Sequence, residues 1–199
     1  VPLTLPPRGP IFVVFRNTIP ASQDGSDDTN WPTWSEMMEF KGPWTVKFDP
    51  QWGGPEAVVF EELEDWTKRP EPGITYYSGT ATYQKAFDLP EAVRPGNRRV
   101  YLNLGKVKHL AEVRLNGKEL GVVWTAPWQV ELTAAIQPTG NYLEIDVVNL
   151  WPNRLIGDAA LPPAQRFTVT NATAFKKESP LLPFGLLGPV SVMVEDRVE

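Results

Sequence analysis

The fold is decided by the stretch Leu110-Ala-Glu-Val-Arg-Leu-Asn116-Gly117-Lys-Glu-Leu-Gly-Val-Val123. Its first half alternates: Ala111, Val113 and Leu115 fall on one side of an extended chain, and charged residues fall on the other. A period of two is typical of a strand with one buried and one solvent-facing side. The Asn-Gly pair tolerates the positive φ angles of a type I′ turn, so the stretch predicts a β-hairpin.

Further short runs on both sides of this hairpin predict a larger sheet structure. The segment Asn141-Tyr-Leu-Glu-Ile-Asp-Val147 alternates in the same way. Several such runs with turn residues between them favour an all-β fold, an antiparallel jelly-roll β-sandwich with little helix. We expect strands at residues 11–15, 42–48, 57–60, 77–87, 98–104, 110–116, 118–123, 127–132, 141–149, 167–169 and 189–194. We expect a helical turn at residues 60–66 and loops at residues 150–161 and 180–189.

The composition bounds the size and class of the protein. With 199 residues, 42% of them hydrophobic, the chain can bury one sizeable core. We expect residues 1–40 to form an N-terminal extension with the first strand, and residues 41–199 to form the sandwich. A net charge of −5 without a basic cluster argues against a nucleic-acid surface. No cysteine is present, which excludes disulfides and thiolate metal sites, and no apolar run reaches the roughly 20 residues of a membrane span.

Several motifs resemble a known group of domains. The runs Gly42-Pro-Trp44, Phe48-Asp-Pro-Gln-Trp-Gly-Gly54 and Tyr77-Ser-Gly-Thr-Ala-Thr-Tyr83 resemble the galactose-binding-like jelly roll of β-galactosidase-like glycoside hydrolases. The run Val148-Asn-Leu-Trp-Pro-Asn-Arg-Leu-Ile-Gly-Asp158 is more specific to one family. Together with Leu181-Leu-Pro-Phe-Gly-Leu-Leu-Gly-Pro189, it resembles the C-terminal region of bacterial family 106 α-L-rhamnosidase-like enzymes.

The resemblance implies an accessory role rather than a catalytic one. In that family a separate barrel domain carries the catalytic acid and base, and nothing in this sequence resembles that barrel. The resemblance therefore implies a non-catalytic module of a polysaccharide-degrading enzyme in the periplasm or outside the cell. Its partners would be the catalytic domain of the same enzyme and a plant or bacterial polysaccharide. Two alternatives stay open: a free-standing carbohydrate-binding module and a self-contained glycosidase.

The sequence offers few candidates for catalysis. A glycosidase needs two carboxyl groups roughly 5 to 10 Å apart. Glu61, Glu62, Glu64 and Asp65 are neighbours in one segment, and a solvated face is the simpler interpretation. His109 is the only histidine, so we expect it to end a strand or to bond within a loop.

Two further kinds of site have weak support. A Ser-His-Asp triad is disfavoured because Ser78 and Ser191 lie in strand-like runs and no Gly-x-Ser-x-Gly elbow is present. The polar run with Asp24, Asp27 and Asp28 offers oxygen ligands for a structural calcium ion, but its spacing does not match an EF-hand loop. No other cofactor is expected.

The tryptophans carry the main functional hypothesis. Sugar rings present C–H faces that stack on aromatic side chains, and amide, guanidinium and carboxylate groups bind their hydroxyls. The candidate contact residues are therefore Trp124, Trp128 and Trp151, together with Asn149, Asn153, Arg154 and Asp158. Core packing is the alternative for each tryptophan. Because Pro152 stops the preceding strand, we predict that Trp151 lies at an end of the sandwich. There it would contact a sugar or, as we favour, the catalytic domain.

Overall fold

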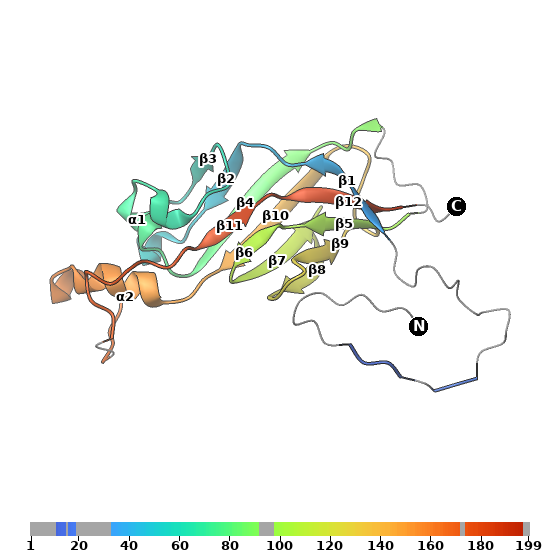
Figure 1. Cartoon of the computed structure of the whole chain (residues 1–199). Coiled ribbons are helices and arrows are strands. Elements are labelled where there is room, and N and C mark those ends of the chain that lie inside the picture. The colour runs from blue at the N-terminus through green and yellow to red at the C-terminus, as the bar shows by residue number, and fades with distance from the viewer. Residues whose placement is uncertain (1–10, 15, 19–32, 92–97, 172–173, 197–199) are drawn as a thin grey trace.

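The computed structural model is a two-layered, antiparallel β-sandwich (Figure 1), described for residues 11–14, 16–18, 33–91, 98–171 and 174–196. One layer has six strands in the order β3-β2-β4-β10-β7-β8, the other has four in the order β1-β12-β5-β9, and β11 pairs with β6. The strands are β1 (Trp34–Glu39), β2 (Trp44–Lys47), β3 (Val58–Phe60), β4 (Thr80–Phe87), β5 (Val100–Asn103), β6 (Lys106–Lys108), β7 (Leu110–Leu115), β8 (Lys118–Val123), β9 (Gln129–Glu131), β10 (Asn141–Val148), β11 (Gly185–Gly188) and β12 (Ser191–Glu195). The predicted all-β fold is confirmed.

In the part of the chain that the structure describes, helical structure is confined to short segments. They are η2 (Pro50–Trp52), η3 (Trp66–Lys68), α1 (Pro72–Thr75), α2 (Pro152–Ala159) and η5 (Pro163–Gln165). Over the described parts of the chain, none of these helices has the length and apolar character needed to cross a membrane. Both α-helices lie at one end of the sandwich, on the left in Figure 1.

The predicted hairpin is present as β7 and β8. Asn116 and Gly117 have φ angles of 55° and 78°, the positive values that a type I′ turn requires. On its other side β7 pairs with β10, where Val113 lies opposite Ile145. The apolar positions of β7 and β10 are completely buried against the second layer. The period-two prediction is therefore confirmed for both strands.

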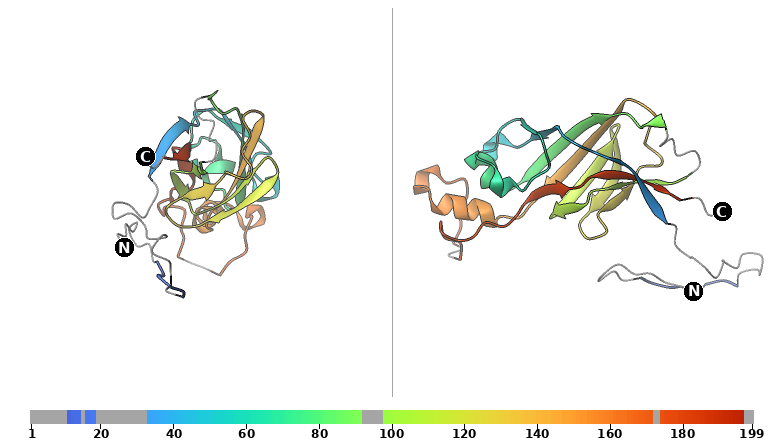
Figure 2. Two further views of the ribbon diagram at one scale, coloured as in Figure 1. Left: turned by 90° about the vertical axis from the view of Figure 1, so that its right-hand side faces the viewer. Right: turned by 45° about the horizontal axis from the view of Figure 1, so that its top comes forward.

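One ribbon joins the sandwich to the α2 end. The pair β5–β12 continues as the pair β6–β11, so β11 and β12 follow one course along the molecule (Figures 1 and 2). Gly105 and Gly188 bridge each other at the bend, with φ angles of 64° and 65°. A Cβ on Gly105 would lie 2.3 Å from the carbonyl carbon of Gly188, so a larger residue cannot fit.

The ribbon corrects one prediction: residues 180–189 are not all loop, because β11 occupies part of them. The sequence suggested a loop because Pro and Gly punctuate this segment. The glycines instead give the strand its bend and its close contacts, while Phe184 and Leu186 are fully buried.

Residues 11–14 form no strand, contrary to expectation, and Phe12 is 90% exposed; the end of the predicted strand, at position 15, lies outside the described residues. The first strand among the described residues is β1, which pairs with β12 so that Trp34 lies opposite Glu195. The strand β12 thus lies between β1 and β5 in its sheet.

Two other predicted elements are also wrong. Residues 61–65 form no helix, because Asp65 instead caps the following turn η3 by accepting a hydrogen bond from the Thr67 backbone N–H at 3.0 Å. Residues 167–169 pair with no strand among the described residues. They form part of an extended segment at the α2 end, which we call the strap (residues 166–170).

Candidate functional site at the α2 end

The segment after β10 forms the helix α2, where the sequence predicted a loop. Pro152 occupies the first helical turn, where its missing N–H has no partner to lose and its fixed φ suits the helix. The Leu155 N–H donates to the Trp151 carbonyl at 3.1 Å and closes the first turn. The prediction that proline stops the strand holds, and Trp151 lies at the end of the sandwich with 52% of its surface exposed.

The two asparagines expected to bind sugar are buried structural residues. Asn149 accepts from the Gly79 N–H and donates to the Tyr77 carbonyl, both at 2.8 Å. Asn153 donates to the carbonyl of Leu182 at 2.8 Å and accepts from its N–H at 2.9 Å. Both side chains are buried and bonded to main chain, so neither is placed on the surface where a ligand could reach it.

Arg154 and Asp158 are also buried, and they pair with each other. The Arg154 Nε lies 3.0 Å from Asp158 Oδ1, with both side chains only 4% exposed. Burial lowers the pKa of Arg154, although Asp158 opposes this change. Asp158 Oδ2 accepts from the backbone N–H and the hydroxyl of Thr168, at 2.8 and 2.6 Å. The pair therefore holds the strap against α2.

Three aromatic rings from distant parts of the chain form a cleft beside the Arg154–Asp158 pair. The rings of Trp52 and Trp151 meet edge to face, with centroids 5.6 Å apart. Phe167, on the strap, covers the Arg154 guanidinium at 4.6 Å and is 40% exposed. A Cβ on Gly53 would lie 2.7 Å from the tip of the Phe167 ring, so only glycine leaves room for it.

The cleft, which we call the aromatic cleft, has a volume of about 340 Å³. It is lined by Trp52, Trp151, Leu155, Phe167, Thr168, Val169 and Thr170. A second hollow of about 320 Å³ shares Leu155 and strap residues 168–170 with it, and is also lined by Arg166 at the start of the strap. Of the cleft residues, the sequence singled out only Trp151, because the other rings come from segments with no local binding signal.

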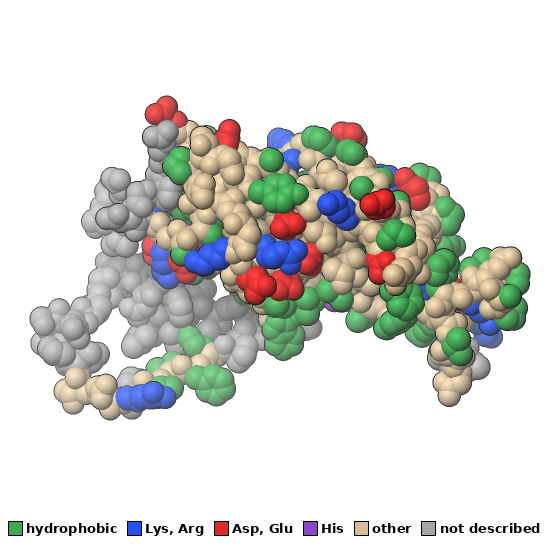
Figure 3. Space-filling view, turned by 180° about the vertical axis from the view of Figure 1, so that it is seen from behind, with side chains coloured by type: hydrophobic (Ala, Val, Ile, Leu, Met, Phe, Trp, Pro, Cys, Tyr) green, Lys and Arg blue, Asp and Glu red, His purple; other side chains and the backbone are tan. Residues whose placement is uncertain are grey.

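The surface around the cleft is apolar. Leu150, Val169 and Leu182 are 48%, 104% and 41% exposed. In Figure 3, where the α2 end lies on the right, hydrophobic side chains are visible at this end among polar groups, as they are at other places on this face. Exposed apolar surface of this kind marks contact sites in soluble proteins.

The other two tryptophans lie elsewhere. Trp124 follows β8 and is 73% exposed, but it does not line the aromatic cleft. Trp128 is half-buried and packs against the core. The structure thus separates the seven predicted contact residues into the exposed Trp151 and Trp124, the packed Trp128, and four buried polar residues.

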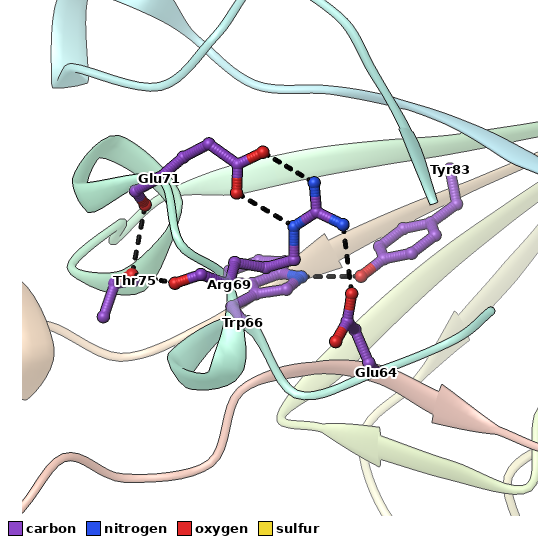
Figure 4. A network of polar contacts seen from close by, with 6 residues as sticks. All are labelled: Glu64, Trp66, Arg69, Glu71, Thr75 and Tyr83. Atoms are coloured by element: carbon purple, nitrogen blue, oxygen red, sulfur yellow. Dashed lines mark hydrogen bonds and ion pairs between the residues drawn. The ribbon is translucent and has the colours of Figure 1, made fainter. Parts of the chain in front are cut away.

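The acidic segment of residues 61–65 contributes Glu64 to a structural network around Arg69. Arg69 donates to Glu71 at 2.7 Å and to Glu64 at 3.1 Å, as Figure 4 shows. Next to it, the buried Trp66 Nε1 donates to the Tyr83 hydroxyl at 2.6 Å. Glu64 is therefore engaged with a cation. Its sequence neighbours Glu61 and Glu62 are exposed.

The remaining candidates show no catalytic arrangement among the described residues. The buried Nε2 of His109 has no hydrogen-bond partner there, and burial lowers the pKa of this side chain. Ser78 donates its hydroxyl to the Leu150 carbonyl at 2.8 Å, and the Ser191 hydroxyl is buried without a partner. The described residues hold no metal-binding group of His, Asp or Glu. The calcium candidates Asp24, Asp27 and Asp28 lie outside them.

The fold places the protein among the galactose-binding-like β-sandwiches. Residues 68–178, more than half of the chain, match the family model described as "Glycosyl hydrolase 2 galactose-binding domain-like". The chain belongs to this family. The expected resemblance to such a domain of a rhamnosidase-like glycoside hydrolase is confirmed.

Relatives of the chain are much longer proteins. It is 38% identical, over 176 residues and 77% of its own length, to a Formosa agariphila protein named "Putative beta-glucuronidase", of which it covers 15%. A rhamnosidase from Novosphingobium sp. PP1Y matches 88% of the chain at 35% identity and a TM-score of 0.77, over 16% of its own length. A β-glucuronidase from Ruminococcus gnavus, at 18% identity and a TM-score of 0.57, shares the fold over 84% of the chain and 30% of its own.

Proposed function

We propose that this chain is a non-catalytic module of an α-L-rhamnosidase-like glycoside hydrolase, which docks on the catalytic domain through its α2 end. The observation that carries the proposal is the match to about one sixth of a rhamnosidase, at 35% identity over 88% of the chain. A segment of that size is a domain within a larger enzyme. The proposed setting is the periplasm or the exterior of the cell, with a plant or bacterial polysaccharide as the substrate of the whole enzyme.

The α2 end supports the docking part of the proposal. Leu150, Trp151 and Val169 together expose apolar surface at the α2 end. Tryptophan is among the residues that most often anchor protein interfaces. The helix below is fixed by Asn153 and by the Arg154–Asp158 pair, so the surface is rigid before contact. A rigid surface loses less conformational entropy when it binds.

Two measurements test the proposal. The isolated chain should hydrolyse neither aryl α-L-rhamnosides nor aryl β-D-glucuronides; turnover that copurifies with the chain would instead establish a self-contained glycosidase. Trp151→Ala should weaken association with the separately expressed catalytic domain by about 2 kcal/mol, or about 30-fold. Trp124→Ala removes a comparably exposed tryptophan outside the α2 end and serves as the matched control.

The free energy of unfolding of the same variants shows whether Trp151 is a surface or a core residue. Because Trp151 is 52% exposed, its loss should reduce the free energy of unfolding by only about 1 kcal/mol. A reduction of about 3 kcal/mol or more would mark Trp151 as a core residue and refute the docking role. Glycan binding by the chain without any association with the catalytic domain would favour the free-standing binding module.

A further inference from the structure

We propose that the aromatic cleft binds a pyranose ring, so that the module supplies a sugar subsite at its junction with the catalytic domain. The place of this subsite in the enzyme rests on the proposed function. Its chemistry rests on the cleft alone, which is open on the isolated chain.

The walls and size of the cleft suit a sugar ring. Its volume of about 340 Å³ lies within the range of ligand sites, roughly 300 to 1,000 Å³. Trp151 and Phe167 are partly exposed, so both rings are accessible from solvent. Trp52 and Trp151 stand nearly perpendicular, at 83°, and therefore offer two differently oriented aromatic surfaces to one ligand. A pyranose has an apolar C–H face that packs on such surfaces.

Val169, which lines the cleft, also brings main-chain polar groups to it. The backbone N–H and C=O of Val169 have no partner among the described residues, and this residue is fully exposed on the strap. Such main-chain groups can donate to and accept from sugar hydroxyls. The neighbouring hollow, which shares the strap, places the Arg166 side chain close by. It gives room for a substituent or for the next sugar of a chain.

The buried polar residues explain why the cleft keeps its shape. A buried ion pair adds little net stability compared with apolar side chains of similar volume, but it fixes geometry. Here Arg154 supports Phe167 from below, and Asp158 binds Thr168 through two hydrogen bonds. Both contacts hold an exposed strap that belongs to no sheet. We therefore infer that Arg154 and Asp158 are positioning residues for the cleft.

The location at a contact surface also favours a ligand site. Small-molecule sites occur preferentially at the interfaces between domains. The exposed Leu150 and Leu182 surround the helix end without lining the cleft. Trp151 belongs to both the docking surface and the cleft, so the subsite would lie at the edge of the domain contact rather than beneath it.

The test titrates the 199-residue chain with methyl α-L-rhamnopyranoside and, separately, with methyl β-D-glucopyranosiduronic acid. The side-chain N–H signals of Trp52 and Trp151 are followed by two-dimensional NMR. Both signals should shift with at least one sugar, with a dissociation constant of about 1 mM, a contact of about −4 kcal/mol. The sugar that binds more tightly identifies whether the cleft prefers a neutral or an anionic ring.

Variants decide whether the cleft is the site. Phe167→Ala and Trp151→Ala should each raise the dissociation constant at least about tenfold, the loss expected for one stacking ring of about 1.4 kcal/mol. Trp124→Ala should leave it unchanged, and circular dichroism verifies that each variant is folded. The proposal is overturned if neither sugar shifts the two signals, or if only Trp124→Ala abolishes binding. Neither result would alter the association with the catalytic domain, so the docking proposal would stand independently.

Discussion

Replacing Arg154 with methionine should destabilise the protein strongly. Methionine fills much of the space but removes the cation, which leaves the Asp158 carboxylate buried with a side chain that is 4% exposed. Removing one partner of a buried pair typically costs about 3 to 5 kcal/mol, because the remaining charge is uncompensated. Asp158 keeps the two hydrogen bonds from Thr168, so we expect the lower end of that range, about 3 kcal/mol.

Urea unfolding followed by tryptophan fluorescence measures this change. With a slope of about 2 kcal/mol per molar urea, a loss of 3 kcal/mol lowers the midpoint by about 1.5 M. Adding Asp158→Asn removes the orphaned charge and keeps an oxygen acceptor for Thr168, so the double variant should recover at least about 1 kcal/mol of the loss. Lys177→Met is the control, because its ion pair with Glu178 is 66% and 68% exposed and should contribute under about 0.5 kcal/mol.

Two outcomes would refute this reasoning. If Arg154→Met lost less than about 1 kcal/mol, the carboxylate would not depend on the guanidinium for its compensation. If the double variant were no more stable than the single one, the loss would come from packing against Phe167 rather than from the unpaired charge.

Two more substitutions test neighbouring contacts. Gly157→Ala should destabilise the fold by about 1 to 3 kcal/mol although alanine favours helices, because its Cβ would lie 2.7 Å from Cγ of Tyr76; thermal unfolding measures the change, and a stabilised variant would contradict the contact. Arg69→Gln should lower stability by about 1 kcal/mol at pH 7, since its carboxylate partners are more than a third exposed. The hydrogen bond from Arg69 lowers the pKa of Glu71, so this contribution is present above the unfolded-state pKa of about 4.3 and is lost as the pH falls through the folded value. Urea midpoints of the wild type and Arg69→Gln should therefore converge as the pH falls below about 4.3, and a constant difference would refute the linkage.

The sandwich was predictable because its layers impose a period of two on the sequence. Val113 and Ile145 are buried neighbours on adjacent strands, and each belongs to a run in which apolar and polar residues alternate. The Asn-Gly pair at 116–117 likewise has one strongly favoured structure. These signals are local, so they survive without any knowledge of tertiary contacts.

The α2 end was less predictable because its structure depends on distant partners. Asn153 looks like a surface residue in the sequence, yet the main chain of Leu182, 29 positions later, satisfies both ends of its amide. The helix is only eight residues long and contains a glycine, which gives it a weak helical signal. Trp52 meets Trp151 across about a hundred residues, so no local pattern could join them.

The pairing of β1 with β12 has a consequence for the evolution of such enzymes. Trp34 lies opposite Glu195, so the polypeptide enters and leaves the sandwich at adjacent points, and these lie far from α2 (Figure 1). Units whose two ends lie close together are tolerated as insertions, because the host needs only a short gap to accommodate them. The sandwich is thus suited to be moved as a cassette between hydrolase scaffolds, with the opposite end free to adapt to each new host.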